Sequence, residues 1–158
     1  MSDATEQHGP ELAELMTGAC YCLATRRASR RMIRTYDAAL AGQGLTISQL
    51  ATLAWVKGLR KPTVQKIADL MEMDQSALSR GLVPLDRDGL ISSSPDAKDK
   101  RKRVLALTAK GETALTKGAV EWAKAQRQIE EELAARGDDL ARLLSGINAL
   151  AVTGEQTD

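Results

Sequence analysis

Residues 73–111, MDQSALSRGLVPLDRDGLISSSPDAKDKRKRVLALTAKG, contain the features that decide the fold. A helical pattern over 75–88 ends at Gly89, a residue type that terminates many helices. Two short apolar segments follow, 90–94 and 104–107, and both have the length and composition of strands. The stretch therefore predicts a helix followed by a β-hairpin.

The loop that joins the two predicted strands concentrates positive charge. Five basic side chains stand there against two carboxylates, a local charge of +3, whereas the whole chain carries only +1. Such a loop can neutralise DNA phosphates or place an arginine in the minor groove, but charge runs are also common in solvated turns. The basic residues are Lys98, Lys100, Arg101, Lys102 and Arg103, and the acidic residues are Asp96 and Asp99.

The segments before the hairpin have the order of a helix-turn-helix. One short helix can begin after Thr46 or Ser48, and a second can begin after Thr63, because these residue types cap helices. The helix over 75–88 presents small polar side chains and an arginine on the side opposite its leucines, as helices that read the DNA major groove do. The predicted outward residues are Gln75, Ser76, Ser79, Arg80 and Val83. Because these helices precede it, we interpret the basic loop as part of a DNA-binding site rather than as a solvated turn. The basic hairpin would then be a wing.

The composition favours packed helices in one globular domain. The chain has 158 residues, of which 43% are hydrophobic and 27% charged, and it lacks phenylalanine. Its core must then consist of Leu, Ile, Val, Met and Ala. No apolar run is long enough to span a bilayer and no signal peptide is evident, so we expect a cytoplasmic protein without a membrane partner.

An enzyme is a remote alternative. The single histidine, His8, precedes the first predicted helix, and no phosphate-binding glycine loop or dinucleotide fingerprint is present. We therefore expect no catalytic residue, metal or cofactor. A thiol enzyme and a helical protein-binding adaptor remain as alternatives from other classes.

Long helices are predicted on both sides of the winged unit, over 11–40, 108–135 and 138–151. They carry more apolar surface than this small unit can cover, which indicates pairing between two copies of the chain.

Two local features of the predicted helices need separate mention. The five arginines within 26–34 could form a second DNA-facing surface, but they are expected on more than one helix face, which favours salt bridges or solvation. Pro84 predicts a kink in the helix over 75–88.

The segment 73–111 resembles the MarR (multiple antibiotic resistance regulator) family of winged helix-turn-helix regulators. The similarity lies in the recognition helix, the Gly-Leu-Ile turn, a wing like Asp-x-Arg-Asp-x-Arg and the Leu-Thr-x-x-Gly end, with Lys98 at the usual first wing arginine. The resemblance covers nearly the whole chain and implies a mainly α fold, with a single MarR-like domain over 1–158. Its winged helix-turn-helix region would be 46–107, and 11–40 and 108–151 would form a dimerisation bundle.

The resemblance also implies a function and its residues. The protein would be a repressor that binds a pseudo-palindromic operator in double-stranded DNA as a homodimer and is released by an effector. Ser76, Ser79 and Arg80 would face bases and phosphates, and Arg101 would enter the minor groove. Asp96 and Asp99 would brace the wing. The other residues expected at the DNA are Thr63, Gln75, Lys98, Lys100, Lys102 and Arg103.

The two cysteines, Cys20 and Cys22, raise the question of the effector. In a continuous helix they would lie about 200° apart, which argues against a disulfide between them and against a shared metal. The segment 22–36 resembles the first helix of the organic-hydroperoxide-sensing branch, with Cys22 at the reactive cysteine and Tyr36 at a supporting tyrosine, whereas Ile47 replaces a second tyrosine. Three possibilities remain open: oxidation of Cys22, a small apolar or phenolic ligand in a cleft between the dimer helices and the winged unit with Cys22 in its lining, and purely structural thiols.

Overall fold

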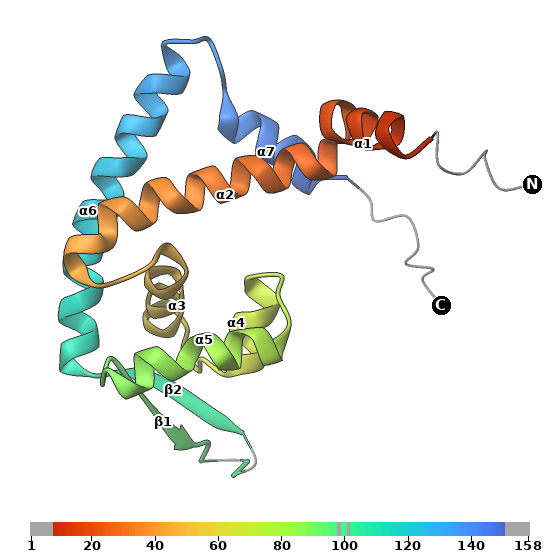
Figure 1. Cartoon of the computed structure of the whole chain (residues 1–158). Helices are drawn as coiled ribbons and strands as arrows, with labels where there is room; N and C mark the ends of the chain where they lie inside the picture. The colour runs from red at the N-terminus through yellow and green to blue at the C-terminus, as the bar shows by residue number, and fades with distance from the viewer. Residues whose placement is uncertain (1–7, 98, 101, 151–158) are drawn as a thin grey trace, which may run out of the picture. The chain divides into compact units, whose positions relative to one another are not determined.

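The computed structural model describes residues 8–97, 99–100 and 102–150 (Figure 1). The fold is mainly helical with one two-stranded antiparallel sheet, as predicted. The chain divides into two compact units, one that ends at Trp122 and one that begins at Ala123. In chain order the elements are α1 (His8–Ala19), α2 (Tyr21–Leu40), the short 3-10 helix η1 (Ala41–Gln43), α3 (Ile47–Gly58), α4 (Val64–Leu70), α5 (Gln75–Arg87), β1 (Ile91–Pro95), β2 (Arg103–Leu107), α6 (Ala109–Ala134) and α7 (Leu140–Asn148).

Helices α3 and α4 begin at the caps that the sequence predicts. The Thr46 hydroxyl accepts a hydrogen bond from the Gln49 amide at 3.2 Å, and the Gln49 side chain accepts one from the Thr46 amide at 2.9 Å. This reciprocal capping box satisfies two amides that the first helical turn leaves unpaired. Thr63 caps α4 in a similar way by accepting from the Lys66 amide at 3.3 Å.

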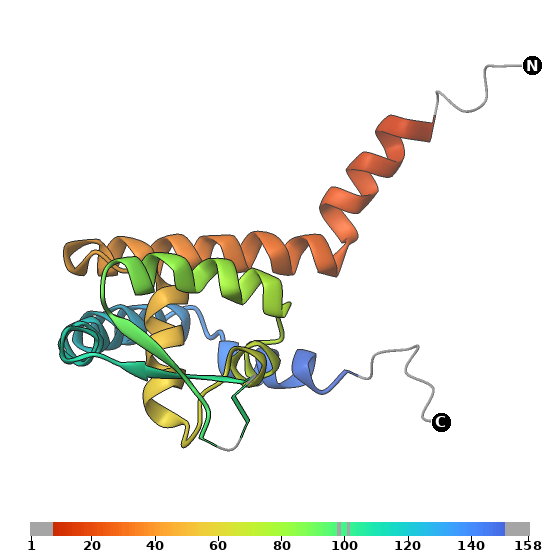
Figure 2. The same ribbon diagram turned by 90° about the horizontal axis from the view of Figure 1, so that it is seen from below.

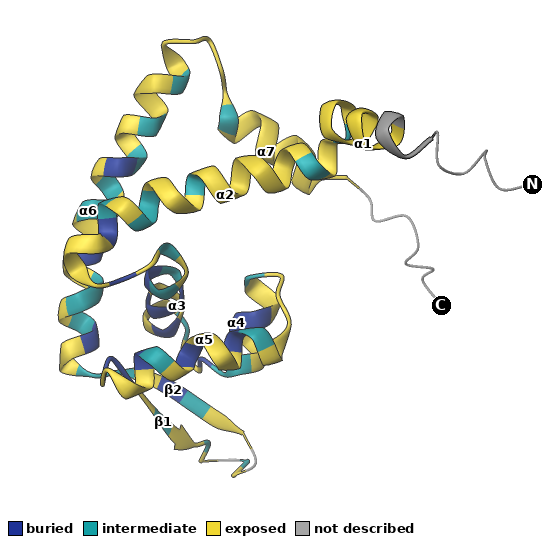
Figure 3. Cartoon of the chain, viewed as in Figure 1, coloured by how far each residue is buried: buried dark blue, intermediate teal, exposed yellow. Residues whose placement is uncertain are grey.

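The core of the first unit lies where α3, α4, α5 and the hairpin meet the end of α2 (Figure 3). It is built from Leu, Ile, Val and Ala side chains, in agreement with the composition. Helix α5 contributes Leu78, Leu82 and Leu85, so the leucine face of the sequence pattern is the buried face. The largest fully buried side chains are Leu40, Leu53, Ile67 and Leu85.

The prediction of one continuous helix over 11–40 is wrong. Helix α1 ends at Ala19 and α2 begins at Tyr21, because Cys20 has an extended backbone conformation with φ −77° and ψ 108°. Gly18, a poor helix former, lies two residues before the break. The 200° angle between the two cysteines assumed an unbroken helix, so that geometric argument against a bond between them no longer applies.

Helix α5 continues through Pro84 to Arg87, and the kink expected there stays a prediction. A further expectation, for the arginines of α2, needs revision. The five arginines of α2 fall within an arc of about 140°, at 100° per residue, and thus on one broad face. All five are exposed, and none has an ion-pair partner within the described part of the chain.

Within the described ranges, no helix combines the length and the apolar character needed to cross a bilayer.

Candidate DNA-binding interface

The outer face of α5 is polar and solvent-exposed. The side chains that the sequence assigns to this face are all exposed, whereas the leucines between them are buried. The arrangement follows from the 3.6-residue period, which turns positions 78, 82 and 85 inward and the polar positions outward. A free polar face on a short helix that follows a tight turn can enter a DNA major groove. The exposed residues are Gln75, Ser76, Ser79, Arg80 and Val83.

The hairpin that follows α5 has a fixed strand register. Ile91 pairs with Leu107 at its base and Pro95 pairs with Arg103 near its tip. The buried side chains of Ile91 and Leu105 anchor the hairpin in the core, and the Leu105 amide donates to the Pro62 carbonyl at 2.8 Å. The hairpin follows α5 directly, is anchored at its base and extends away from α5 toward its tip (Figure 2).

Asp96 holds the start of the wing loop. One carboxylate oxygen accepts from Lys61 Nζ at 2.9 Å, and the other accepts from the Asp99 amide at 3.2 Å. The Asp96 side chain is only 12% exposed, which strengthens a charged hydrogen bond relative to one in bulk water. The Asp99 carbonyl in turn accepts from the Lys102 amide at 2.9 Å. The Asp96 side chain thus holds the start of the loop, and Lys61 is a partner that the sequence did not predict. The bracing role of the two aspartates stays a prediction.

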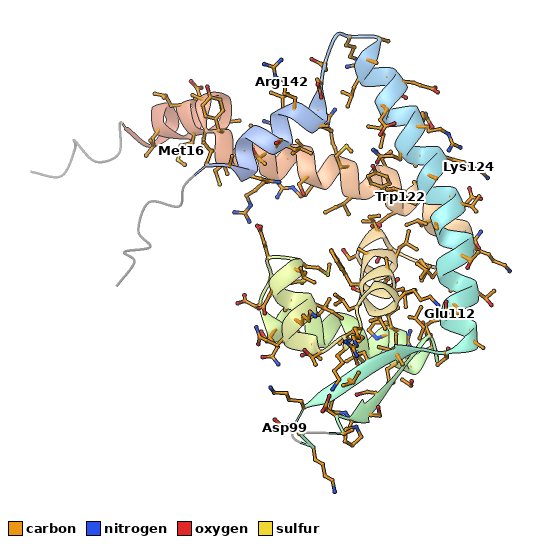
Figure 4. All side chains as sticks on the ribbon, turned by 180° about the vertical axis from the view of Figure 1, so that it is seen from behind. Met16, Asp99, Glu112, Trp122, Lys124 and Arg142 are labelled. Atoms are coloured by element: carbon orange, nitrogen blue, oxygen red, sulfur yellow. The ribbon has the colours of Figure 1, made fainter. Side chains whose placement is uncertain are left out.

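The basic residues of the wing differ in their surroundings. Lys100 and Lys102 are exposed. Arg103 donates to the Ser93 hydroxyl at 2.7 Å and to the Ser93 carbonyl at 2.6 Å, so its guanidinium is held along β1. Lys98 and Arg101, for which roles were also predicted, lie outside the described residues. Asp99 marks the tip of the hairpin in Figure 4.

Thr63 lies half-buried at the start of α4. Its hydroxyl oxygen accepts from the Lys66 amide. The hydroxyl proton stays available to an acceptor such as a phosphate oxygen.

The thiols and Tyr36 do not form a cluster within one protomer. Cys20 is half-buried at the break between α1 and α2, whereas Cys22 is exposed. Tyr36 is half-buried, and 14 residues of helix α2 separate it from Cys22, about 21 Å along the axis. Among the described residues, no group of three or more His, Cys, Asp or Glu side chains could hold a metal ion.

An apolar pocket of about 380 Å³ lies between α3 and the first half of α6. Both tryptophans of the chain line it, and Figure 4 labels the Trp122 side chain on α6. Its walls offer almost no hydrogen-bonding groups, so they suit an apolar or aromatic molecule better than a charged one. The lining residues are Ile47, Leu50, Ala51, Ala54, Trp55, Leu115, Ala119 and Trp122.

A helix-turn-helix followed by an anchored basic hairpin defines a winged-helix DNA-binding protein. The comparisons with known proteins agree: the sequence profile of the MarR family matches residues 45–102. The transcriptional regulator MosR of M. tuberculosis, solved in complex with DNA, is 35% identical, with 82% of this chain and 91% of MosR covered and a TM-score of 0.71. The chain therefore belongs to the MarR family of DNA-binding transcriptional regulators and is not an enzyme.

Two more distant structures share the fold. MepR of S. aureus in complex with DNA is 23% identical, with 82% of this chain and 98% of MepR covered and a TM-score of 0.68. PcaV of Streptomyces coelicolor in complex with its natural ligand is 20% identical, with 82% and 90% covered and a TM-score of 0.72. No curated protein matches the chain.

Proposed function

We propose that the protein is a repressor that binds a pseudo-palindromic operator as a homodimer, with α5 in the major groove and the wing on the minor groove. The observation that carries this proposal is the exposed polar face of α5 beside a basic hairpin anchored through Asp96. The DNA complex of the 35% identical MosR supports it. The residues proposed to contact DNA are Thr63, Gln75, Ser76, Ser79, Arg80, Lys98, Lys100, Arg101, Lys102 and Arg103.

Exposed apolar side chains on α1 and α7 support the homodimer. In one protomer Leu12 and Leu15 of α1 are 60% and 65% exposed, and Leu143 of α7 is 60% exposed. A stripe of large apolar side chains in water is unfavourable, and a second copy can cover it. We therefore propose the terminal helices as the dimer interface, within one MarR-like domain that spans the chain.

Arg101→Ala should weaken operator binding markedly. By the family resemblance this arginine enters the minor groove, where it would neutralise one phosphate charge and release its counterions. The slope of log affinity against log salt should fall by roughly one unit. The measurement is a fluorescence titration of labelled operator DNA, selected from random duplexes, at several salt concentrations. Lys117→Ala on the exposed surface of α6 is the charge-matched control, and unchanged affinity and slope in Arg101→Ala would remove Arg101 from the interface.

For the effector we propose oxidation of the Cys22 thiol. Cys22 is exposed, so an oxidant can reach it in the protomer. Because Cys22 and Tyr36 lie about 21 Å apart along α2, the two could approach each other only across a dimer. A tyrosine hydroxyl that donates to the thiolate would favour the reactive ionised form.

Organic hydroperoxide should release DNA from the wild type and from Cys20→Ser, but not from Cys22→Ser. The three proteins are treated with hydroperoxide and then titrated with operator DNA, and thiol reduction should restore binding to the released proteins. Release from Cys22→Ser as well, or from none of the three, would rule out sensing at Cys22.

The alternative effector, favoured by the apolar pocket, is a small apolar or phenolic ligand. Both tryptophans line this pocket, so intrinsic fluorescence reports its occupation directly. If such a ligand quenches this fluorescence and releases DNA equally from the wild type and Cys22→Ser, the pocket rather than the thiol is the effector site.

A further inference from the structure

A cluster of hydrogen bonds joins the start of α6 to the turn between α5 and β1. The Thr108 hydroxyl donates to the Gly89 carbonyl at 2.7 Å, with the Leu90 carbonyl at 3.3 Å. The Thr108 amide donates to the Leu90 carbonyl at 3.1 Å. The same hydroxyl accepts from the Gly111 amide at 3.0 Å, which caps α6. One threonine thus both starts α6 and binds the turn after α5.

Neighbouring contacts reinforce this joint, which we define as residues 88–90 together with 108–111. Lys110 Nζ donates to the Asp88 carbonyl at 2.8 Å. Gly111 packs directly on the turn, since a Cβ atom there would lie 1.9 Å from the Leu90 carbonyl oxygen. The carbonyls of three consecutive residues after α5 are therefore all held by α6.

The turn is closed by its own hydrogen bonds. Gly89 adopts the left-handed conformation with φ 67°, and the Leu90 amide donates to the Leu85 carbonyl at 2.8 Å. The Gly89 amide donates to the Asp86 carbonyl at 2.9 Å. These two bonds form a Schellman motif, which closes the end of α5 and sets the direction of the chain into the wing. Strand β1 begins at the next residue, Ile91, and pairs there with Leu107, which precedes Thr108.

We infer that Thr108 is a positioning residue that sets the angle of the wing relative to α5, and thereby the DNA affinity, without touching DNA. The inference rests on the proposed DNA-binding function and adds a residue outside the DNA-facing set. Residues 91 and 107 form the base of the hairpin, and Leu105 holds β2 in the core two residues further on. A change of direction at this base would move the basic tip further than it moves the base itself. At the joint, the residues that precede β1 (88–90) are hydrogen-bonded to the residues that follow β2 (Thr108 and Lys110).

Thr108→Val should weaken operator binding about tenfold, because valine keeps the side-chain shape but cannot donate to Gly89 or cap α6. The salt slope should fall together with affinity, since the wing charges no longer meet the phosphates. Thr113→Val and Thr116→Val are matched controls, because these hydroxyls donate only to carbonyls of α6 itself. Both controls should bind DNA like the wild type, and Thr108→Ser, which keeps the hydroxyl, should restore affinity.

A double-mutant cycle that combines Thr108→Val with Arg101→Ala separates an effect on the orientation of the wing from a general loss of structure. If Thr108 acts through the wing, Thr108→Val should weaken binding by a clearly smaller factor in the Arg101→Ala background than in the wild type, because one of the wing contacts is already lost. The inference would be overturned if the affinity losses of Thr108→Val and Arg101→Ala simply multiplied in the double mutant. It would also be overturned if Thr108→Val and Thr113→Val bound DNA equally well. All titrations are done below the unfolding midpoint of each variant. Failure of the wild type to bind DNA would refute the proposed function instead.

A second variant keeps the test decisive if Thr108→Val does not fold. Lys110→Gln removes only the bond to the Asp88 carbonyl, and Lys117→Gln is its charge-matched control on the same helix. Lys110→Gln should weaken binding about threefold more than its control, and this difference should be smaller in the Arg101→Ala background. Equal binding by the two lysine variants, or an undiminished difference without Arg101, would overturn the inference.

Discussion

Gly111→Ala should destabilise the protein by about 3 kcal/mol, a large fraction of the stability of a domain of this size. The new Cβ atom would lie 1.9 Å from the Leu90 carbonyl oxygen and 2.9 Å from its carbonyl carbon. The obstacle is backbone, and the Leu90 amide and carbonyl are both held in hydrogen bonds. Neither α6 nor the turn can therefore move away without breaking the joint. The unfolding midpoint should drop by roughly 10 °C in a thermal melt followed by circular dichroism.

Gly81→Ala is the matched control. Gly81 also lies within a helix, but apart from its chain neighbours and the nearby backbone of its own helix, no atom lies within 4 Å of the position of its added Cβ. Alanine is a better helix former than glycine, so this variant should be as stable as the wild type or slightly more stable. Equal melting temperatures for Gly111→Ala and Gly81→Ala would show that α6 does not pack on Leu90 as described.

Deletion of residues 1–20, which contain α1, should abolish the dimer while the winged unit stays folded. The large apolar side chains of α1, Leu12, Leu15 and Met16, are 45–65% exposed within one protomer, so their loss costs that protomer little. In a dimer their burial would contribute about 5 kcal/mol in total, which corresponds to a factor of roughly 4 × 10³ in the dimer dissociation constant. Operator affinity should fall with it, because one protomer reads only one half-site.

Light scattering and DNA titration over a range of protein concentrations measure both effects. Replacing the three apolar side chains with serine in the full-length chain should reproduce the deletion. Glu14→Ser, on the same helix, is the control and should leave the dimer intact. A truncated protein that remains a dimer with full operator affinity would exclude α1 from the interface. Loss of the winged unit's thermal transition would instead show that α1 stabilises each protomer directly.

The sequence by itself determined the elements of the winged unit. Its signals there are local: threonine caps at positions 46 and 63, a leucine period in α5, Gly89 at the end of that helix and two apolar segments around a basic loop. Each signal involves only a few neighbouring residues, and all of them predict the same order of helices and strands. The buried leucines and exposed polar residues of α5 were predictable for the same reason.

Only the tertiary structure decided what depends on segments far apart in the chain. Lys61 pairs with Asp96 across 35 positions, and Thr108 reaches Gly89 across 19. No periodicity encodes such contacts, because they depend on where two separately formed elements come to lie. The pocket lined by both tryptophans is of this kind, as is the close approach that requires glycine at position 111. The break at Cys20 escaped prediction for a related reason: the apolar period continues across it, and a period reports which face of a helix is apolar, not whether the backbone between two helices is straight.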